Sequence, residues 1–279
     1  MSPQLDEICS QKAQSHSEFR FRRINKVSDP QVSEFIIPSQ VAQLKDWKID
    51  HFSNEHTKLA QEEILRTLNS KGPFGISTDR FPSPETFSTS RVKITYLHLV
   101  FTYSVSLAKQ NKDDGNLRIL DFGGGVGNHV HLLESLLPHI NFSFSLVELE
   151  ANLALATLLN PQISTHRDLS TLETFDFVHL GSSLQYCRNY DVIIKQLTQK
   201  EPSHILFTRT PTSLGPTVAF RSKNSFMHWV FSISDLIIKM KAQGYELVRI
   251  FDASDCQTYT TSKIELSVQE SQILFRRSD

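Results

Sequence analysis

The residues with the clearest chemical potential form a short glycine-rich segment with an acid beside it. Gly123, Gly124, Gly125 and Gly127 follow an apolar stretch that contains Asp121, and a helical pattern begins a few residues later. Glycines between a strand and a helix let a ligand approach the main chain, where the amides of the helix N-terminus point at it. The segment therefore predicts a site for a nucleotide-like ligand.

Three ligands fit such a turn: a nucleoside triphosphate, a dinucleotide or S-adenosylmethionine. A triphosphate site needs a lysine after the turn, and the residues Gly127–His129 contain none. A dinucleotide site usually has the spacing G-x-G-x-x-G, whereas Gly123, Gly125 and Gly127 have the spacing G-x-G-x-G. Asp121 would repel a pyrophosphate and attract a cationic amino group and sulfonium. The residues therefore favour S-adenosylmethionine.

The rhythm of the chain after residue 117 predicts a doubly wound α/β fold. Short apolar runs alternate there with amphipathic stretches, which is typical of a mostly parallel sheet with helices on its faces. The last two strands follow one another without a helix, which predicts antiparallel pairing. The expected strands are 118–122, 142–148, 175–180, 204–209, 245–251 and 272–275, and the expected helices are 91–110, 127–138, 150–159, 188–199 and 233–243.

The first ninety residues differ from the rest of the chain. Residues 39–70 carry apolar side chains at roughly helical spacing, and the stretch that follows is rich in Gly, Pro, Ser and Thr, which favour turns. We expect residues 1–90 to form an N-terminal helical region with a linker that caps the site. Residues 91–279 are expected to form the cofactor-binding domain.

Composition excludes several classes of partner. The formal net charge is −1, from 29 basic and 30 acidic residues, so no overall field draws the protein to nucleic acid or to an anionic membrane. The N-terminus lacks the apolar core of a signal peptide, and no segment approaches ~18 unbroken apolar residues. We expect a cytoplasmic protein. Cys9, Cys187 and Cys256 form no CxxC pattern and are expected to be free thiols.

The string LDFGGGVG resembles the first motif of the class I S-adenosylmethionine-dependent methyltransferases. The resemblance implies a Rossmann-like methyltransferase fold and places Glu148, at the end of SLVE, on the two ribose hydroxyls, with Glu150 as the fallback. Asp168, in THRD, would meet the adenine amino group or cap the next short helix. In FDFVHLGSSLQY, the residues that would line the cofactor are Leu180, Gly181 and Ser182.

A narrower resemblance concerns the acceptor. The strings DFGGGVGN, LVE, GSSLQY, TRTP and HWVFSISDL…GYELV are similar to those of a family of bacterial methyltransferases associated with surface-polysaccharide and other secondary biosynthesis. This resemblance covers about residues 90–279. It implies transfer of a methyl group to a small-molecule acceptor, and we expect a hydroxyl oxygen of a sugar, glycan or secondary-metabolite intermediate.

Methyl transfer requires a nucleophile held in line with the methyl group, and a base where a hydroxyl must lose its proton. His228, on an expected loop over 211–228, is the candidate base, although a histidine with such apolar neighbours more often has a packing role or forms a loop hydrogen bond. Tyr186 is a candidate substrate contact. Arg209 would pair an acceptor carboxylate or phosphate, or form an internal ion pair.

His129 and His131 form a His-x-His pair, which invites a metal interpretation. No acidic residue or cysteine lies near them at the usual ligand spacing. We therefore expect a solvated helix face and no metal. Two other functions stay open: an oxidoreductase that uses NAD or NADP, and a non-catalytic module that keeps the methyltransferase fold as a scaffold.

Overall fold

The computed structural model describes residues 32–36, 38–41, 96–110, 112, 115–222, 227–251, 256–260 and 265–278. The chain divides into two units, Met1–Pro30 and Gln31–Asp279, and every described residue belongs to the second. Of the helices expected within 39–70, only α2 (Pro38–Val41) falls among the described residues. The linker expected to follow them lies outside the described residues.

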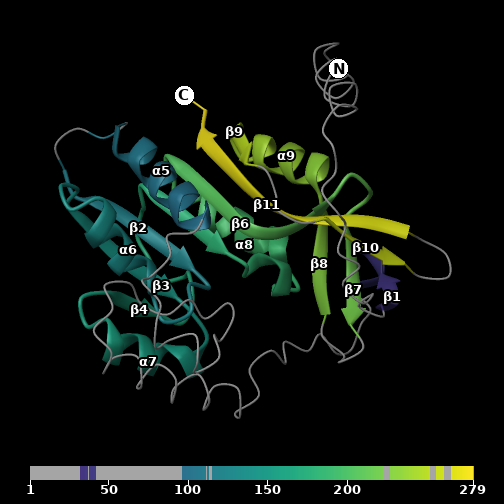
Figure 1. The fold of residues 1–279 in the computed structure, drawn as a ribbon, viewed down its shortest axis with the longest axis horizontal. Helices are drawn as coiled ribbons and strands as arrows, with labels where there is room; N and C mark the ends of the chain where they lie inside the picture. Colours follow the sequence, from purple (N-terminus) through teal and green to yellow (C-terminus); the bar gives the residue numbers. More distant parts are fainter. Residues whose placement is uncertain are drawn as a thin grey trace. The chain divides into compact units, whose positions relative to one another are not determined.

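A parallel sheet forms the centre of the second unit (Figure 1). Its strands are β2 (Leu117–Phe122), β3 (Phe142–Val147), β4 (Ser164–His166), β5 (Phe177–Gly181) and β6 (His204–Ser213). They lie in the order β4-β3-β2-β5-β6, and each neighbouring pair is parallel. Because β2 has a neighbour on each side, the chain winds first toward β4 and then toward β6, as in other doubly wound sheets.

The end of the chain completes the sheet with antiparallel strands. These are β9 (Tyr245–Phe251), β10 (Cys256–Thr260) and β11 (Glu265–Arg277). The strand β11 lies between β6 and β9 and is antiparallel to both. The predicted antiparallel last strand is therefore confirmed, although 272–275 covers only part of a strand that is much longer.

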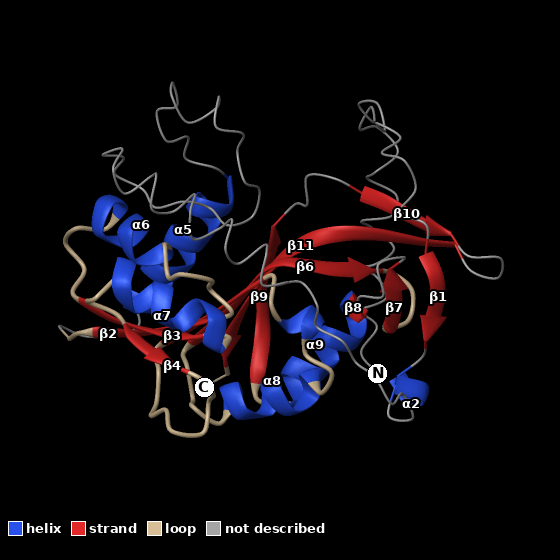
Figure 2. Cartoon of the chain, turned by 90° about the horizontal axis from the view of Figure 1, so that it is seen from below, coloured by secondary structure: helices blue, strands red, loops and turns tan. Residues whose placement is uncertain are grey.

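Helices cover both faces of the sheet. Neighbouring residues of β6 show this, because Leu206 packs in one hydrophobic cluster and Phe207 in the other. The first cluster includes residues of α5 (Tyr96–Gln110), α6 (His129–Leu136) and α7 (Glu150–Leu159). The second includes residues of η1 (Leu184–Tyr186), α8 (Tyr190–Thr198) and α9 (Ile233–Ala242). Figure 2 shows α8 and α9 across the sheet from α5 and α6.

The predicted helices of the α/β domain are confirmed, and their ends have local causes. Ser232 caps α9, because its hydroxyl oxygen accepts a hydrogen bond from the Asp235 amide at 3.4 Å. Gly244 follows α9 with a φ of 83°, the left-handed conformation that commonly ends a helix. No helix among the described residues is both long enough and apolar enough to cross a membrane.

The loop expected over residues 211–228 is replaced by strands. The strand β6 continues to Ser213, and β7 (Val218–Ser222) and β8 (Met227–Ser232) form an antiparallel pair. In β6 the side chains of Thr208, Thr210 and Thr212 are buried at alternate positions. Threonine suits a strand, but the proline and glycine that follow obscured the alternation in the sequence.

The N-terminal region also contributes a strand, just before the residues 39–70 that were expected to be helical. The residues of β1 (Val32–Ile36) form a strand that pairs antiparallel with β7. We call β1, β7 and β8 the side sheet. It joins the main sheet where β8 runs parallel to the end of β6. A small cluster, called here the side core, packs there and consists of Val218, Phe220, Val230, Leu266 and Val268.

Asp176 organises the edge of the sheet where β2 begins. Its carboxylate accepts hydrogen bonds from the Arg118 amide at 2.7 Å, the Arg118 guanidinium at 2.9 Å and the Lys112 ammonium at 2.5 Å. Burial raises the pKa of this carboxyl, but the hydrogen bonds from Arg118 and Lys112 outweigh burial and lower the pKa to about 2. Folding therefore stabilises the ionised form of the Asp176 carboxyl.

We expect Asp176→Asn to lower the free energy of unfolding by about 1–3 kcal/mol at pH 7, because hydrogen bonds to charged groups are lost. The folded-state pKa lies below the unfolded value, so the wild-type advantage is complete above about pH 4. It should disappear as the pH falls through about 2. Urea unfolding of both proteins across this range measures the difference.

The matched control is Glu246→Gln, which breaks the exposed ion pair with Arg276 between two antiparallel strands. Exposed pairs contribute about 0–1 kcal/mol. A loss for Asp176→Asn that is no larger than this control, or that does not vary with pH, would contradict the assignment.

Candidate functional site

The glycine-rich segment forms the turn between β2 and α6. Gly123, Gly125 and Gly127 have φ angles of 72°, 64° and 80°, a region that residues with side chains rarely adopt. The Gly127 amide donates to the Gly124 carbonyl at 3.1 Å and tightens the turn. We call residues 123–127 the glycine turn.

Close contacts within the protein also demand these glycines. A Cβ on Gly123 would lie 2.2 Å from the Cβ of Ser183, and one on Gly127 would lie 2.5 Å from Ile163 Cδ1. A Cβ on Gly124 would lie 2.1 Å from an oxygen of Asp121. The sequence analysis attributed the glycines to the approach of a ligand. The structure adds that neighbouring strands and side chains already fill the space on the protein side of the turn.

Glu148 follows β3 directly and lies against the glycine turn. Its Oε2 accepts a hydrogen bond from the Gly125 amide at 2.9 Å, and its Oε1 accepts one from the Leu149 amide at 2.7 Å. Burial raises the pKa of Glu148, and these hydrogen bonds only partly offset that effect. The fallback residue Glu150 is exposed and pairs with Arg167 instead. Of the two acids, Glu148 is therefore the one at the turn.

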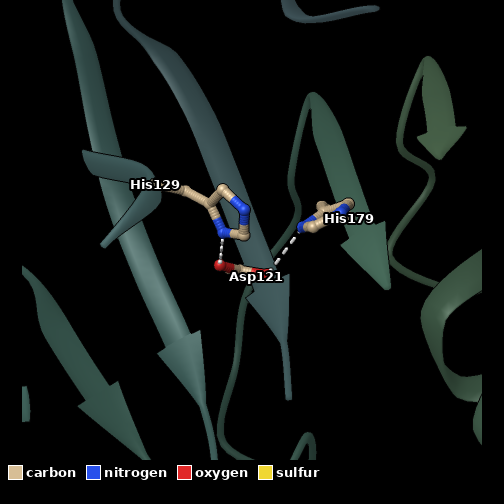
Figure 3. Close-up of side chains that lie close together, drawn as sticks. All are labelled: Asp121, His129 and His179. Atoms are coloured by element: carbon tan, nitrogen blue, oxygen red, sulfur yellow. Dashed lines mark hydrogen bonds and ion pairs between the residues drawn. The ribbon is translucent and has the colours of Figure 1, made fainter. Parts of the chain in front are cut away.

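Asp121 does not occupy the position that its charge suggested. Its side chain is 0% exposed, and Figure 3 shows it between two histidines. One oxygen lies 2.8 Å from His129 Nδ1, and the other lies 2.8 Å from His179 Nδ1. Burial raises the pKa of Asp121, but the two imidazoles outweigh burial and hold it well below its usual value. The expectation that Asp121 contacts a cationic ligand directly is therefore corrected: its carboxylate is buried and hydrogen-bonded to two imidazoles inside the protein.

The environment of His129 is a further correction. Its side chain is 29% exposed and contacts Asp121, so it does not lie on a solvated helix face as predicted. His131 is on the outer side of α6, with its Nδ1 3.1 Å from Glu134 Oε2. Asp121, His129 and His179 each offer a potential metal-ligating atom within 4.8 Å of one another. The sequence analysis missed this group because His179 comes from β5, far from the His-x-His pair in sequence.

The end of β5 lies beside the glycine turn. Leu180 is 1% exposed and packs in the core, so its side chain does not line a binding site as expected. Ser182 has a φ of 55°, and its amide donates to the Thr208 carbonyl at 2.9 Å. The Ser183 hydroxyl donates to the Phe122 carbonyl at 2.7 Å. These contacts fix the segment from Gly181 to Ser183 against both β2 and β6.

Asp168 forms a local turn on the surface. It accepts hydrogen bonds from the amide and the hydroxyl of Ser170, which lower the pKa of its carboxyl. Asp168 therefore caps a local segment, as the second of its two predicted roles required, although that segment is a turn rather than a helix. The contact with adenine that the resemblance implied stays a prediction.

His228 and Tyr186 are brought together from distant parts of the sequence. His228 lies on β8 rather than on a loop, and its ring centroid is 4.0 Å from that of Phe220 and 6.3 Å from that of Tyr186. The indole of Trp229 donates to the Cys187 carbonyl at 3.0 Å and ties β8 to the segment after η1. An aromatic cluster thus holds the candidate base.

Arg209 lies on β6 at an irregular point of the strand. Its φ is 52°, and its amide donates to Gln272 Oε1 at 2.6 Å. Its guanidinium Nε is 3.9 Å from Glu270 Oε2. The structure therefore shows the internal ion pair that the sequence analysis gave as the alternative to an acceptor contact.

Gln185 of η1 and Cys187, which follows η1, are largely covered by the protein. Gln185 is 2% exposed, and its Nε2 donates to Ser182 Oγ at 2.9 Å. Its Oε1 has no hydrogen-bond partner among the described residues. Cys187 is a free thiol, and burial raises its pKa to about 11, which keeps it neutral. Cys9 and the side chain of Cys256 lie outside the part of the chain that the structure describes.

Comparison with solved structures identifies the fold of the chain. No family model matches the sequence, and no curated protein sequence matches it. A proposed sarcosine dimethylglycine methyltransferase from Galdieria sulphuraria matches with a TM-score of 0.51 and 11% identity, over 81% of this chain and 99% of that chain. CalS10, an amino pentose methyltransferase from Micromonospora echinaspora, has a TM-score of 0.43 and 14% identity, over 68% and 97%. The cyclase SpnF has a TM-score of 0.45 and 13% identity, over 63% and 80%.

The strands of this chain have the order of a doubly wound sheet. The main sheet has the order β4-β3-β2-β5-β6-β11-β9, with β11 antiparallel to both of its neighbours in that order. The glycine turn follows the central strand β2, where the winding of the sheet changes direction. The chain has the fold of the class I S-adenosylmethionine-dependent methyltransferases.

Proposed function

We propose that the chain is an S-adenosylmethionine-dependent methyltransferase. The observation that carries the proposal is the Glu148 carboxylate, which lies on the Gly125 amide at the carboxyl edge of the sheet. Ligands of open α/β sheets bind outside this edge, at the point where the strand order reverses. An acid there suits the two hydroxyls of a ribose, because a carboxylate has two acceptor oxygens.

The residues of the turn fit the cofactor in chemistry. The glycines of the turn have no side chains to separate a ligand from the main chain, and Glu148 would exchange its hydrogen bond with the Gly125 amide for bonds with ribose hydroxyls. Gly181 and Ser182 would lie along the opposite side of the ligand. When bound, S-adenosylmethionine supplies an activated methyl group, so the protein mainly has to orient the acceptor.

The acceptor in this proposal is a small molecule with a hydroxyl oxygen as nucleophile, such as a sugar, glycan or secondary-metabolite intermediate. His228 and Tyr186 support this assignment, because they bring an imidazole and a phenol together beside the segment that follows β5. An imidazole nitrogen of His228 would accept the hydroxyl proton, since histidine titrates near working pH. Arg209 would orient the acceptor only after it leaves Glu270.

Calorimetry with S-adenosylhomocysteine tests the cofactor, and we expect micromolar binding. NADH and NADPH are the necessary controls, because the buried Asp121 does not contact a ligand directly and so does not by itself distinguish a sulfonium from a pyrophosphate. Binding of a nicotinamide nucleotide alone would replace the proposal with an oxidoreductase.

Substitution of Glu148 tests the carrying observation. Glu148→Gln should weaken S-adenosylhomocysteine binding by about tenfold to a hundredfold, the effect of losing a charged hydrogen-bond acceptor. The raised pKa of Glu148 has a further consequence: wild-type affinity should fall at mildly acidic pH, while Glu148→Gln should show no such fall. The matched control is Glu150→Gln, which should bind like the wild type. Loss of binding in this control alone would move the ribose contact to Glu150.

His228→Asn tests the candidate base. We expect it to bind S-adenosylhomocysteine within about twofold of the wild type and to lower methyl transfer by about a hundredfold. Transfer of a labelled methyl group to a panel of sugars, sugar nucleotides and phenols measures the rate. Phe220→Leu, which changes the ring beside His228 but leaves the imidazole, serves as the packing control. Equal loss in both variants would limit His228 to packing.

A further inference from the structure

Among the described residues, Asp121 is the one aspartate or glutamate that is fully buried. Moving a charge out of water is costly unless partners compensate it, and breaking such an arrangement is strongly destabilising. The chain nevertheless places this charge directly beneath the glycine turn, where a Cβ on Gly124 would collide with it. The partners of Asp121 therefore lie beneath the turn on which the proposed function places the cofactor.

Two imidazoles provide that compensation. The low pKa of Asp121 keeps the carboxylate ionised, so both of its oxygens are hydrogen-bond acceptors. His129 Nδ1 and His179 Nδ1, each 2.8 Å from a different oxygen, must therefore carry hydrogens and donate. Figure 3 shows the two rings approaching the carboxylate from different sides. The orientation of the carboxylate is fixed as a result.

The Thr208 hydroxyl complements the hydrogen that His179 carries on Nδ1. The other ring nitrogen, Nε2, lies 2.8 Å from the Thr208 hydroxyl oxygen, and both side chains are buried. When this hydroxyl donates to Nε2, a neutral His179 keeps its hydrogen on Nδ1, which faces Asp121. The hydroxyl of β6 thus orients the ring of β5 toward the carboxylate of β2.

The contacts join the two segments that surround the proposed cofactor position. His129 is the first residue of α6, so its bond to Asp121 connects the start of that helix with the end of β2 and closes the glycine turn. His179 lies opposite Asp121 on the neighbouring strand β5, two residues before Gly181. Asp121, His129, His179 and Thr208 are called here the buried polar network.

Phe101 of α5 covers this network. Its ring centroid lies 4.7 Å from that of His129 and 5.0 Å from that of His179, and Phe101 is 1% exposed. An apolar cover lowers the local dielectric, which strengthens the bonds beneath it and raises the cost of breaking any one of them.

We propose that His129, His179 and Thr208 are positioning residues of the cofactor site: through Asp121 they hold the glycine turn and the end of β5 in the arrangement that binds the ligand. This inference rests on the proposed function. It assigns to Asp121 a role beneath the turn rather than in contact with the ligand.

The same side chains are of types that bind divalent metal ions. Hydrogen bonds account for them more fully, because both 2.8 Å contacts join an imidazole nitrogen to a separate carboxylate oxygen and Thr208 occupies the remaining nitrogen of His179. The metal interpretation is therefore an outcome to be tested rather than a second proposal.

Calorimetry with S-adenosylhomocysteine on the full chain tests the inference through near-isosteric variants. Thr208→Val removes the hydroxyl with little change in shape, and we expect it to weaken binding by roughly fivefold to tenfold. Thr208→Ser keeps a hydroxyl and should stay within about twofold of the wild type. His129→Leu should lose about tenfold or more, and His129→Asn, which keeps an N–H group near the Nδ1 position, should recover most of that loss.

The control for a merely structural effect is His204→Asn. His204 is also a buried histidine, with a pKa that burial lowers to about 4, but it lies at the opposite end of β6. We expect this variant to lower thermal stability and to leave affinity unchanged. Weakened binding in His204→Asn that matches His129→Leu, or wild-type affinity in both Thr208→Val and His129→Leu, would overturn the inference.

Two further outcomes separate this inference from its alternatives. Dialysis of the wild type against EDTA should leave its affinity unchanged; a loss that Zn²⁺ restores would overturn the hydrogen-bonded network in favour of a metal site. A wild type that does not bind S-adenosylhomocysteine would overturn the proposed function together with the inference. Unchanged affinity in the variants of a wild type that does bind would overturn the inference alone.

Discussion

The Asp121 carboxylate is fully buried at the end of β2, where an unpaired charge would cost several kcal/mol. Its two imidazole partners come from the start of α6 and from β5, and the second of these is oriented by β6. Three neighbouring strands and one helix must therefore be in register before the charge is balanced. The glycine turn lies on top of this group, so its conformation depends on an electrostatic requirement below it.

Two acids near one turn thus differ in what they do. Asp121 is buried among donors, and its charge is stabilised inside the fold. Glu148 lies at the rim, where burial raises its pKa. Its carboxylate oxygens accept hydrogen bonds from two backbone amides, which a ligand hydroxyl can replace. Environment rather than residue type decides which acid is available to a ligand.

The sequence predicted the alternating strands and helices of the main sheet. Alternation of apolar runs and amphipathic stretches identified the main strands and helices, because a strand covered on both faces needs continuous apolar residues, as Ile119 and Leu120 illustrate. It also placed Glu148 and the glycine turn correctly with respect to one another. It did not predict β7 and β8 of the side sheet, because the proline and glycine residues near the start of 211–228 are typical of a loop. Nor did it pair Asp121 with His179, since that contact depends on strand register, which one sequence does not specify.

The side core has a consequence for how the molecule can change. Its five apolar residues form a cluster of their own, distinct from the two clusters on the faces of the main sheet. Phe220, which packs against His228, is one of them. Core substitutions are felt mainly by the side chains that they touch. Substitutions in the side core can therefore tune the surroundings of the His228 imidazole with little direct effect on the glycine turn. The neighbours of His228 on β8, Met227, Trp229 and Phe231, instead pack in a cluster of the main sheet and are constrained together with it.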